Sequence, residues 1–457
     1  MNRNNQSELT RRQFIQSNLT AALAAAVFPA IIPASALGQD GATAPSERIV
    51  VGCIGAGNRG QDVLGGFLPQ KSCQVMALCD VKQDVRAGAK AMVDKHYQNQ
   101  DCQTYGDFRE LLDRKDIDAV LIASTDHWHE FHALAAVRAD KDVYLEKPLG
   151  LSLDQDQALR REVQARKRVF QFGTQQRSDK NFRLACELIR NGHLGKLKHI
   201  NLWAPGSTAG GSTKVAPPPP PLDYTFWLGP APYREHTENL TANSNWWYIS
   251  DFALGFIAGW GIHPVDIALW GAGDLATGMV EVEGKGEFPK EGLHDTATNW
   301  DIDWKYASGL TMKFTSTPAK GNMNKQLGED WGKKYGKIGG HGTAFEGTDG
   351  WILVDRGNIV THPASLVELE TEPGRLPKKL IHSPDHVGNF LDAVKTRQPT
   401  VSPIESAVQS DAFCHVSDVA IRVQRKLRYD GTAERIVDDE AANKRLHVRP
   451  LRAPWKV

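Results

Sequence analysis

Three glycines near the start of the folded sequence have the spacing of a dinucleotide-binding turn. Gly55, Gly57 and Gly60 directly follow an apolar run, and a helical pattern begins after them. In such a turn the first glycine permits the bend, and the second lets the backbone approach a pyrophosphate. The third lets helix and strand pack closely. The helix N-terminus, here Asn58 and Arg59, then faces the phosphates. The turn predicts a nicotinamide dinucleotide site.

A carboxylate at the end of the next apolar run indicates which dinucleotide fits. Asp80 follows the run 75–79 at about the separation expected for a ribose ligand. Its oxygens can accept hydrogen bonds from both ribose hydroxyls and would repel a 2′-phosphate. We therefore predict NAD. Lys82 keeps NADP open as the alternative, and a helix N-cap is the role for Asp80 that requires no ligand.

Two further polar segments follow apolar runs that read as neighbouring strands. One is Ser124–His129 and the other is Glu146-Lys147-Pro148. Ligands of open α/β sheets bind outside the carboxyl ends of the strands, so both segments are expected at the cofactor. Taken singly, Trp128 could be a core residue and His129 a helix-start histidine. The predicted cofactor contacts are Ser124, Thr125, Trp128, His129, Glu146, Lys147 and Pro148.

The elements that must position these residues read as a doubly wound parallel sheet. From residue 48 to 172, short apolar runs alternate with helical patterns, which is typical of βα units. We predict an NAD(P)-binding Rossmann domain over 48–172. Its expected strands are 49–54, 75–79, 119–123, 142–145 and 169–172, and its expected helices are 84–96, 108–113, 130–139 and 153–166.

The second half has a different pattern. Period-two alternation predicts a C-terminal α/β domain over 173–430 with a large, mainly antiparallel open sheet, followed by an arm over 431–457. A length of 457 residues also favours two domains. The five prolines 217–221 forbid sheet pairing and indicate a surface excursion near a cleft. The expected elements are helices 180–191, 386–396 and 405–425, strands 197–202, 277–283, 296–304 and 310–314, and a hairpin over 351–360 with its turn at 356–358.

The first 36 residues resemble a twin-arginine signal peptide. Arg11 and Arg12 precede an apolar run over 19–32, and Ala34-Ser35-Ala36 is a small-residue cleavage pattern. We expect 1–36 to be this signal and 37–47 a linker. The protein would use the twin-arginine export machinery and reach a periplasmic or other extracytoplasmic location.

The composition further narrows the class of protein to which the chain can belong. Lys plus Arg and Asp plus Glu both number 54, so no basic field indicates a nucleic-acid partner. After the signal, no apolar run reaches the roughly 18 residues of a membrane helix. Six cysteines show no metal-finger spacing. We predict no metal site and no required disulfide.

In these motifs the chain resembles the glucose–fructose oxidoreductase, inositol dehydrogenase and rhizopine-catabolism family (Gfo/Idh/MocA), in particular its signal-bearing bacterial branch. The matching pieces are Gly55–Gly60, Thr125–His129, Glu146–Pro148, Trp227–Pro230, Trp260–Asp266 and His386–Asp392. The resemblance implies a Rossmann domain followed by an antiparallel-sheet domain. The substrate lies between the two, and the outer face of the sheet commonly makes homo-oligomers.

The resemblance also assigns catalytic roles. Lys147 resembles the lysine that reaches nicotinamide and the substrate hydroxyl, where an ammonium stabilises the developing alkoxide. His263 resembles the acid/base histidine. Many sugar dehydrogenases of this family have an aspartate four residues before that histidine, but this chain has Gly259 there. Asp266, three residues after His263, could orient the imidazole if the segment is helical.

Together these features predict hydride transfer between a sugar, glycoside or polyol and a tightly held NAD. An oxidation–elimination–reduction glycosidase is the second candidate, and a non-catalytic sugar-binding protein the third. Aromatic faces stack on sugar rings, although core packing would account for about half of the tryptophans. The predicted substrate contacts are Arg177, Trp246, Trp260, His263 and Asp266.

Overall fold

The protein is built around two β-sheets, one parallel and one mainly antiparallel. The computed structural model describes residues 44–242, 244–317, 329–336 and 338–456. The signal and most of the linker predicted from the sequence lie outside the described residues. The short segment before the first strand contains one 3-10 turn, Pro45–Glu47. No helix in the described ranges has the length and apolar character needed to cross a membrane.

The first sheet is parallel, as the sequence predicts, with the strand order β3-β2-β1-β4-β5-β6. Its central strands are buried because helices cover both faces, so they read as continuous apolar runs. The strands are β1 (Ile49–Ile54), β2 (Cys73–Cys79), β3 (Gln103–Tyr105), β4 (Ala119–Ile122), β5 (Asp142–Leu145) and β6 (Phe170–Phe172). The helices are α2 (Asn58–Phe67), α3 (Gln83–Tyr97), α4 (Phe108–Leu112), α5 (Asp126–Arg138) and α6 (Leu153–Ala165).

The second sheet has nine strands in the order β13-β12-β11-β7-β10-β9-β8-β14-β15. The pair β7–β10 is parallel and the other pairs are antiparallel. The strands are β7 (Leu197–Pro205), β8 (Met279–Glu287), β9 (Asn299–Tyr306), β10 (Thr311–Thr317), β11 (Gly342–Gly347), β12 (Trp351–Asp355), β13 (Asn358–His362), β14 (Leu427–Asp430) and β15 (Arg435–Val437). The predicted α/β fold class is confirmed.

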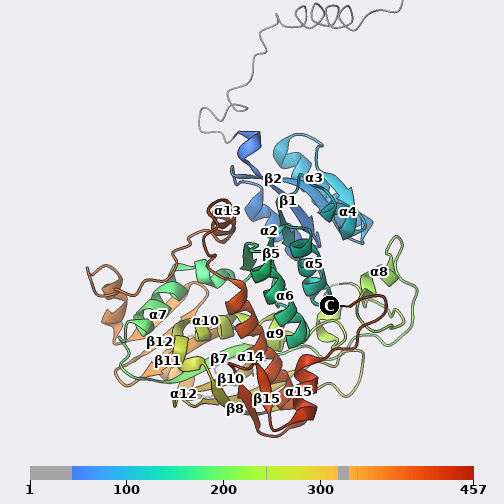
Figure 1. Cartoon of the computed structure of the whole chain (residues 1–457). Helices are drawn as coiled ribbons and strands as arrows, with labels where there is room; N and C mark the ends of the chain where they lie inside the picture. The colour runs from blue at the N-terminus through green and yellow to red at the C-terminus, as the bar shows by residue number, and fades with distance from the viewer. Residues whose placement is uncertain (1–43, 243, 318–328, 337, 457) are drawn as a thin grey trace, which may run out of the picture. The chain divides into compact units, whose positions relative to one another are not determined.

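Helices of the second half connect the two sheets. Helices α7 (Lys180–Arg190), α10 (Ile262–Ala272) and α14 (Ile404–Val423) pack on the nine-stranded sheet, and α14 also contacts α6 (Figure 1). Helix α13 (His386–Thr396) returns to the parallel sheet, where Phe390 meets Phe67 and Tyr144 edge to face. One apolar core cluster therefore includes residues of both sheets. Helix α15 (Glu440–His447) packs against β15.

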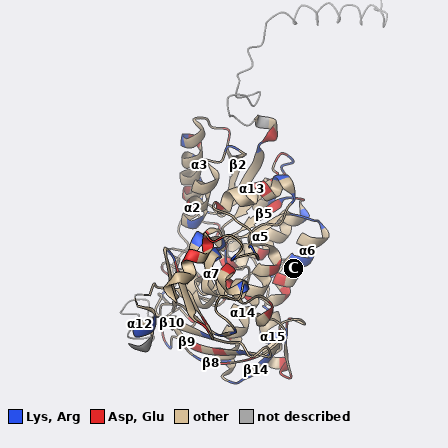
Figure 2. Ribbon diagram, turned by 90° about the vertical axis from the view of Figure 1, so that its left-hand side faces the viewer, with Lys and Arg blue, Asp and Glu red and all other residues tan. Residues whose placement is uncertain are grey.

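The segment between β7 and α10 is mostly irregular and carries short helices. These are η4 (Asn245–Tyr248), α8 (Tyr224–Leu228) and α9 (Phe256–Gly259). The five prolines 217–221 form neither helix nor strand, as predicted. Charges of both signs are interspersed over the ribbon (Figure 2), in agreement with the balanced composition.

All six cysteines are buried free thiols. Burial raises the pKa of Cys73 to about 12 and that of Cys102 to about 11. Because the thiolate is the reactive form, these side chains act as small apolar residues.

Candidate dinucleotide and substrate site

A cavity of about 420 Å³ lies at the carboxyl ends of β1, β2, β4 and β5. The predicted cofactor residues Gly55, Gly57, Asn58, Arg59, Asp80, Ser124, Thr125, Trp128, His129, Glu146 and Lys147 all line it. Phe226, Trp227, Thr241, Ser244, Trp246 and Trp247, from the segment after β7, form the opposite wall. The cavity thus lies between the parallel sheet and the second half of the chain.

The glycine turn has the geometry that a dinucleotide needs. Gly55 has φ +85°, and a Cβ there would lie 2.4 Å from the backbone nitrogen of Ser124. A Cβ on Gly60 would lie 2.1 Å from the carbonyl oxygen of Gly55, so this glycine permits the close packing of helix on strand. A Cβ on Gly57 would meet no atom within 4 Å. Gly57 therefore leaves room for phosphates at the start of α2, and the turn fits the group that the sequence predicts.

Asp80 is tied to the same turn. Its Oδ2 accepts a hydrogen bond from the amide of Ala56 at 2.9 Å, and its Oδ1 accepts one from the amide of Lys82 at 2.9 Å. The N-cap of α3 is Lys82, so Asp80 does not cap that helix. A carboxylate has about four acceptor positions, which leaves lone pairs for ribose hydroxyls. The Lys82 ammonium donates to the carbonyl of Thr241 at 2.6 Å.

The segment Ser124–His129 starts helix α5 and joins the other motifs. The indole of Trp128 donates to the carbonyl of Trp227 at 2.9 Å and stacks on His132 with ring centroids 4.6 Å apart. The ring of His129 contacts the carbonyl of Pro148 through Nδ1 at 2.6 Å and that of Ser124 through Nε2 at 3.0 Å. These contacts fix the segments after β4 and β5 relative to one another.

Glu146 and Arg59 form an ion pair at the cavity wall. Arg59 Nη2 lies 2.7 Å from Glu146 Oε1, and the exposed fractions of the side chains are 42% and 3%. The second carboxylate oxygen of Glu146 is buried without a hydrogen-bond partner among the described residues. The pair connects the glycine turn with the residue next to Lys147.

Lys147 occupies the junction between the cavity and the second half of the chain. Its ammonium donates to the carbonyl of Gly259 at 2.6 Å and lies 5.0 Å from the ring centroid of Trp247. Burial lowers the pKa of Lys147, while the charges of Glu146 and Asp126 oppose that shift. Lys147 is therefore a partly desolvated cation that donates to the second half of the chain and lies within electrostatic range of carboxylates of the first half.

Asp126 is a site residue that the sequence analysis did not select. It is the first residue of α5, lines the cavity and is 2% exposed. Both of its carboxylate oxygens lie 3.2 Å from the indole nitrogen of Trp247, which donates to them. Burial raises the pKa of Asp126 well above its ordinary value, and Lys147 opposes that shift. Asp126 thus places a carboxyl group within electrostatic range of Lys147, and both residues contact Trp247.

His263 lies in a cluster behind Lys147 and does not line the cavity itself. Its Nδ1 is buried without a hydrogen-bond partner among the described residues. Burial lowers its pKa well below the ordinary value, and Lys147 and Arg356 add to the effect. The imidazole is therefore neutral and has a free nitrogen. Trp260 and His341 are its ring neighbours, each with its centroid 6.1 Å from that of His263.

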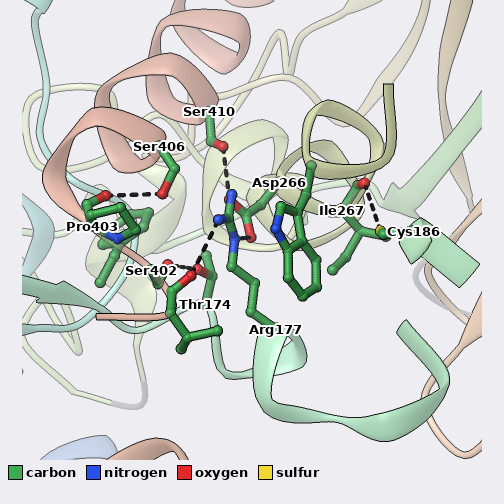
Figure 3. Close-up of polar contacts among 12 residues, drawn as sticks. Thr174, Arg177, Cys186, Asp266, Ile267, Ser402, Pro403, Ser406 and Ser410 are labelled. Atoms are coloured by element: carbon green, nitrogen blue, oxygen red, sulfur yellow. Dashed lines mark hydrogen bonds and ion pairs between the residues drawn. The ribbon is translucent and has the colours of Figure 1, made fainter. Parts of the chain in front are cut away.

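Arg177 and Asp266, both predicted substrate contacts, instead pair with each other. Arg177 donates through Nε and Nη2 to the two carboxylate oxygens of Asp266, both at 2.7 Å, and Ser410 donates to the same carboxylate (Figure 3). The side chains are 6% and 0% exposed. The guanidinium also lies 5.1 Å from the ring centroid of Trp270. Their substrate contact remains a prediction without support from this geometry, and Asp266 is engaged away from His263.

The predicted aromatic substrate contacts fall in two places. Trp246 lines the cavity beside Trp247, with ring centroids 5.5 Å apart. Trp260 lies in the His263 cluster, where its ring centroid is 5.9 Å from the Lys147 ammonium. Gly60 and Pro148, which were also predicted to contact the cofactor, do not line the cavity.

A buried acidic cluster lies under the loop that follows Pro148. Asp411 accepts hydrogen bonds from the amides of Leu149 and Gly150 at 3.3 and 3.2 Å. His415 Nε2 lies 3.1 Å from the carboxylate of Asp411, and Asp156 completes a group whose ligand atoms lie within 4.8 Å of one another. The predicted absence of a metal site remains a prediction. In this structure, the hydrogen bonds of Asp411 hold the loop that follows Pro148.

Comparison with known proteins agrees with this arrangement. Residues 49–174 match the family model described as "Oxidoreductase family, NAD-binding Rossmann fold", and residues 203–457 match "Oxidoreductase family, C-terminal alpha/beta domain". An inositol 2-dehydrogenase of Salmonella typhimurium is 31% identical over 147 residues, which are 32% of this chain and 42% of the relative. A glycosyl hydrolase family 109 protein of Saccharopolyspora erythraea is 38% identical over 112 residues, 24% of each chain. The chain thus aligns with less than half the length of these relatives.

Solved structures share the fold. GenD2 from gentamicin A biosynthesis, in complex with NAD, aligns with TM-score 0.60 at 16% identity, covering 85% of this chain and 98% of GenD2. The WlbA dehydrogenase of Bordetella pertussis, in complex with NADH and UDP-GlcNAcA, aligns with TM-score 0.60 at 13% identity, covering 83% and 98%. The glycine turn, the two polar strand ends and both family models lead to one conclusion: this chain belongs to the Gfo/Idh/MocA oxidoreductase family and has its NAD-binding Rossmann domain.

Proposed function

We propose that the protein transfers hydride between a hydroxyl-bearing carbon of a sugar, glycoside or polyol and NAD. The observation that carries the proposal is the position of Lys147, which lines the dinucleotide cavity together with Asp126 and contacts the carbonyl of Gly259 and the ring of Trp247. NAD bound along the glycine turn supplies the hydride acceptor. An ammonium in this place can donate a hydrogen bond to the substrate oxygen and stabilise the negative charge that develops there.

His263 is the proposed proton acceptor. Its unpartnered Nδ1 and its low pKa give a neutral imidazole that can take the hydroxyl proton. Asp126 has a supporting role, because its charge favours the ammonium form of Lys147. This arrangement differs from the Lys–Asp–His set implied by the resemblance, since the carboxyl group comes from α5.

The test is a screen of sugars, glycosides and polyols against the purified protein with its retained nucleotide. Formation of reduced nicotinamide, followed by its near-ultraviolet absorbance, is expected with one substrate class and should be lost in Lys147→Ala. Folded, NAD-loaded protein that reduces no nicotinamide and cleaves no glycoside would overturn the proposal.

A glycosidase is the second candidate, favoured by the glycosyl hydrolase family 109 relative and by glycine at position 259. In that reaction a hydride would pass from the sugar to NAD, the aglycone would leave by elimination, water would add to the unsaturated sugar, and the hydride would return. It predicts release of the aglycone without net consumption of NAD. The same panel distinguishes the two reactions when released aglycone and reduced nicotinamide are measured together.

We further propose that the protein is exported by the twin-arginine route with its nucleotide in place. The support is the pattern in residues 1–36, together with the scarcity of free NAD expected outside the cytoplasm. Tight retention and recycling of NAD within one active site follow from that location. Mass spectrometry of the mature N-terminus tests export, and the homo-oligomer implied by the family is tested by the solution mass.

A further inference from the structure

Arg356 places a guanidinium beside the proposed catalytic residues. It sits in the turn between β12 and β13 and is exposed. Its Cζ lies 5.5 Å from the ring centroid of Trp260, the same indole that lies 5.9 Å from the Lys147 ammonium. A turn of the antiparallel sheet therefore carries a cation to the His263 cluster.

Arg356 has no structural partner that would explain it. It forms no ion pair or hydrogen bond with any described residue, and its guanidinium lies over the face of Trp260. By contrast, Arg59 pairs with Glu146 and Arg177 with Asp266. A guanidinium carries five donors in a planar fork that fits a carboxylate or a phosphate. These donors are available to a ligand.

The charges around Arg356 are mainly positive. Lys147 and Arg59 both lie within electrostatic range, and Glu146, the acidic group in range, is already paired with Arg59. The positive charges of Lys147 and Arg356 also act on His263 and His341. Burial is the main cause that lowers the pKa of both histidines, and these cations lower it further. An anion bound there would compensate this excess of positive charge.

Polar groups in the His263 cluster also lack partners. His263 Nδ1 and Gln176 Oε1 are buried without a hydrogen-bond partner among the described residues, and both residues are over nine-tenths buried. Gln176 Nε2 lies 2.9 Å from His341 Nε2, which places Gln176 in the same cluster. Buried polar groups in native proteins are normally satisfied, so this set indicates a site completed by a polar ligand.

We propose that Arg356 binds an anionic group of the substrate, so that the protein acts on a sugar bearing a carboxylate or a phosphate. The inference rests on the proposed function and specifies its substrate class. Lys147 would contact the reacting hydroxyl, and Arg356 would orient the ring by holding the charged substituent, with His341 and Gln176 as neighbouring polar groups.

The experiment compares three forms of each of glucose, galactose and mannose: the neutral sugar, the uronate and the terminal phosphate ester. Turnover and calorimetric binding are measured with the NAD-loaded protein and with Arg356→Ala and Arg356→Lys. Arg375→Ala is the matched control, because this arginine is about half exposed and pairs with Glu372 on the surface.

For the sugar that is accepted, we expect one anionic form to exceed the neutral form by about 10- to 100-fold in kcat/KM, the range of a charge-assisted contact. Arg356→Ala should remove that advantage, so that the anionic and neutral forms of the sugar have similar kcat/KM values, and should leave the NAD bound. Arg356→Lys should keep part of it, and Arg375→Ala all of it. Whether the uronate or the phosphate is preferred identifies the anion.

Other outcomes would overturn the inference. It is wrong if neutral sugars are used as well as the anionic forms, or if no anionic form binds. It is also wrong if Arg356→Ala loses NAD, since the guanidinium would then serve the cofactor. If Arg356→Ala still turns over neutral sugars, the proposed oxidoreductase function stands even where the inference about the anion is wrong. If an anionic sugar binds but is neither oxidised, reduced nor cleaved, the proposed function is wrong and the inferred anion site still stands.

Discussion

The ammonium of Lys147 lies 2.6 Å from the carbonyl oxygen of Gly259, at the position where many sugar dehydrogenases of this family have an aspartate. The backbone thus provides the acceptor that a side chain would otherwise supply. Asp126, at the start of α5, places a carboxyl group within electrostatic range of Lys147 and accepts a hydrogen bond from the indole of Trp247. The site retains a lysine next to a carboxyl group, but the carboxyl group comes from the Rossmann domain.

Removing the Lys147 ammonium should abolish most of the chemistry without unfolding the protein. Lys147→Ala is expected to lower kcat by about 10²–10³-fold, the cost of losing one preorganised donor to a developing oxyanion. Retained NAD and the melting temperature should stay close to those of the parent protein. Lys95→Ala, on the exposed side of α3, is the control. Unchanged kcat in Lys147→Ala would contradict the role.

Neutralising Asp126 should shift the pH dependence toward acid. The charge of Asp126 raises the pKa of Lys147, so Asp126→Asn is expected to lower that pKa further. The alkaline limb of the kcat/KM profile, where Lys147 loses its proton, should move to lower pH. Asparagine can still accept from Trp247, so the geometry is conserved. An unchanged alkaline limb would show that the two groups are not coupled.

The Arg177–Asp266 pair is expected to stabilise the fold. Arg177→Met leaves a buried carboxylate without its partner and should lower the free energy of unfolding by about 3–5 kcal/mol. The double variant with Asp266→Leu should recover part of that loss, because no lone charge remains. Urea unfolding measures both. Arg428→Met, in a pair whose members are 53% and 74% exposed, should cost no more than about 1 kcal/mol. A neutral result for Arg177→Met would favour the substrate contact predicted from the sequence.

Asp156 should make stability depend on pH. Burial and the neighbouring carboxylates of Asp411 and Glu130 raise the pKa of Asp156 well above its ordinary value of 3.8. The folded state therefore binds this proton more tightly than the unfolded state, and stability falls as pH rises above the unfolded value toward the raised pKa. Asp156→Asn should raise the melting temperature at pH 8 and have little effect near pH 4. Asp113→Asn, on an exposed helix end, is the control. A loss of stability at pH 8 would mean that the carboxylate has a partner cation.

Local sequence patterns were sufficient for most of the fold. The parallel sheet was predictable because its strands are continuous apolar runs separated by helical patterns, and the hairpin turn at Arg356-Gly357 was correctly placed. Strand β11 was missed because Gly342–Gly347 contains two glycines and lacks clear alternation. Helix α5 begins at Asp126, four residues before the predicted start, because histidines and a tryptophan obscure its period.

The sequence was sufficient to predict those parts of the site in which residues close together in the sequence carry the chemistry. The glycine turn, Asp80 and the segment containing Lys147 all line one cavity, as expected. Asp126, His341 and Arg356 were missed as site residues, since their importance comes from tertiary contacts with residues far away in the sequence. Arg177 was selected as a possible substrate ligand and Asp266 for its position three residues after His263, but only the fold shows that each is the other's partner.

The most direct test of the account is a single-turnover experiment on the purified protein with the nucleotide it retains. The released nucleotide is first identified by mass spectrometry, and a preferred sugar is then added without free NAD. The account predicts that NAD is retained and that the absorbance of reduced nicotinamide rises. The rise lasts if the protein is a dehydrogenase and is transient if it is a glycosidase. In Lys147→Ala the rise is lost. A protein that neither retains nor binds NAD, or whose NAD is never reduced by any sugar, glycoside or polyol, would contradict it.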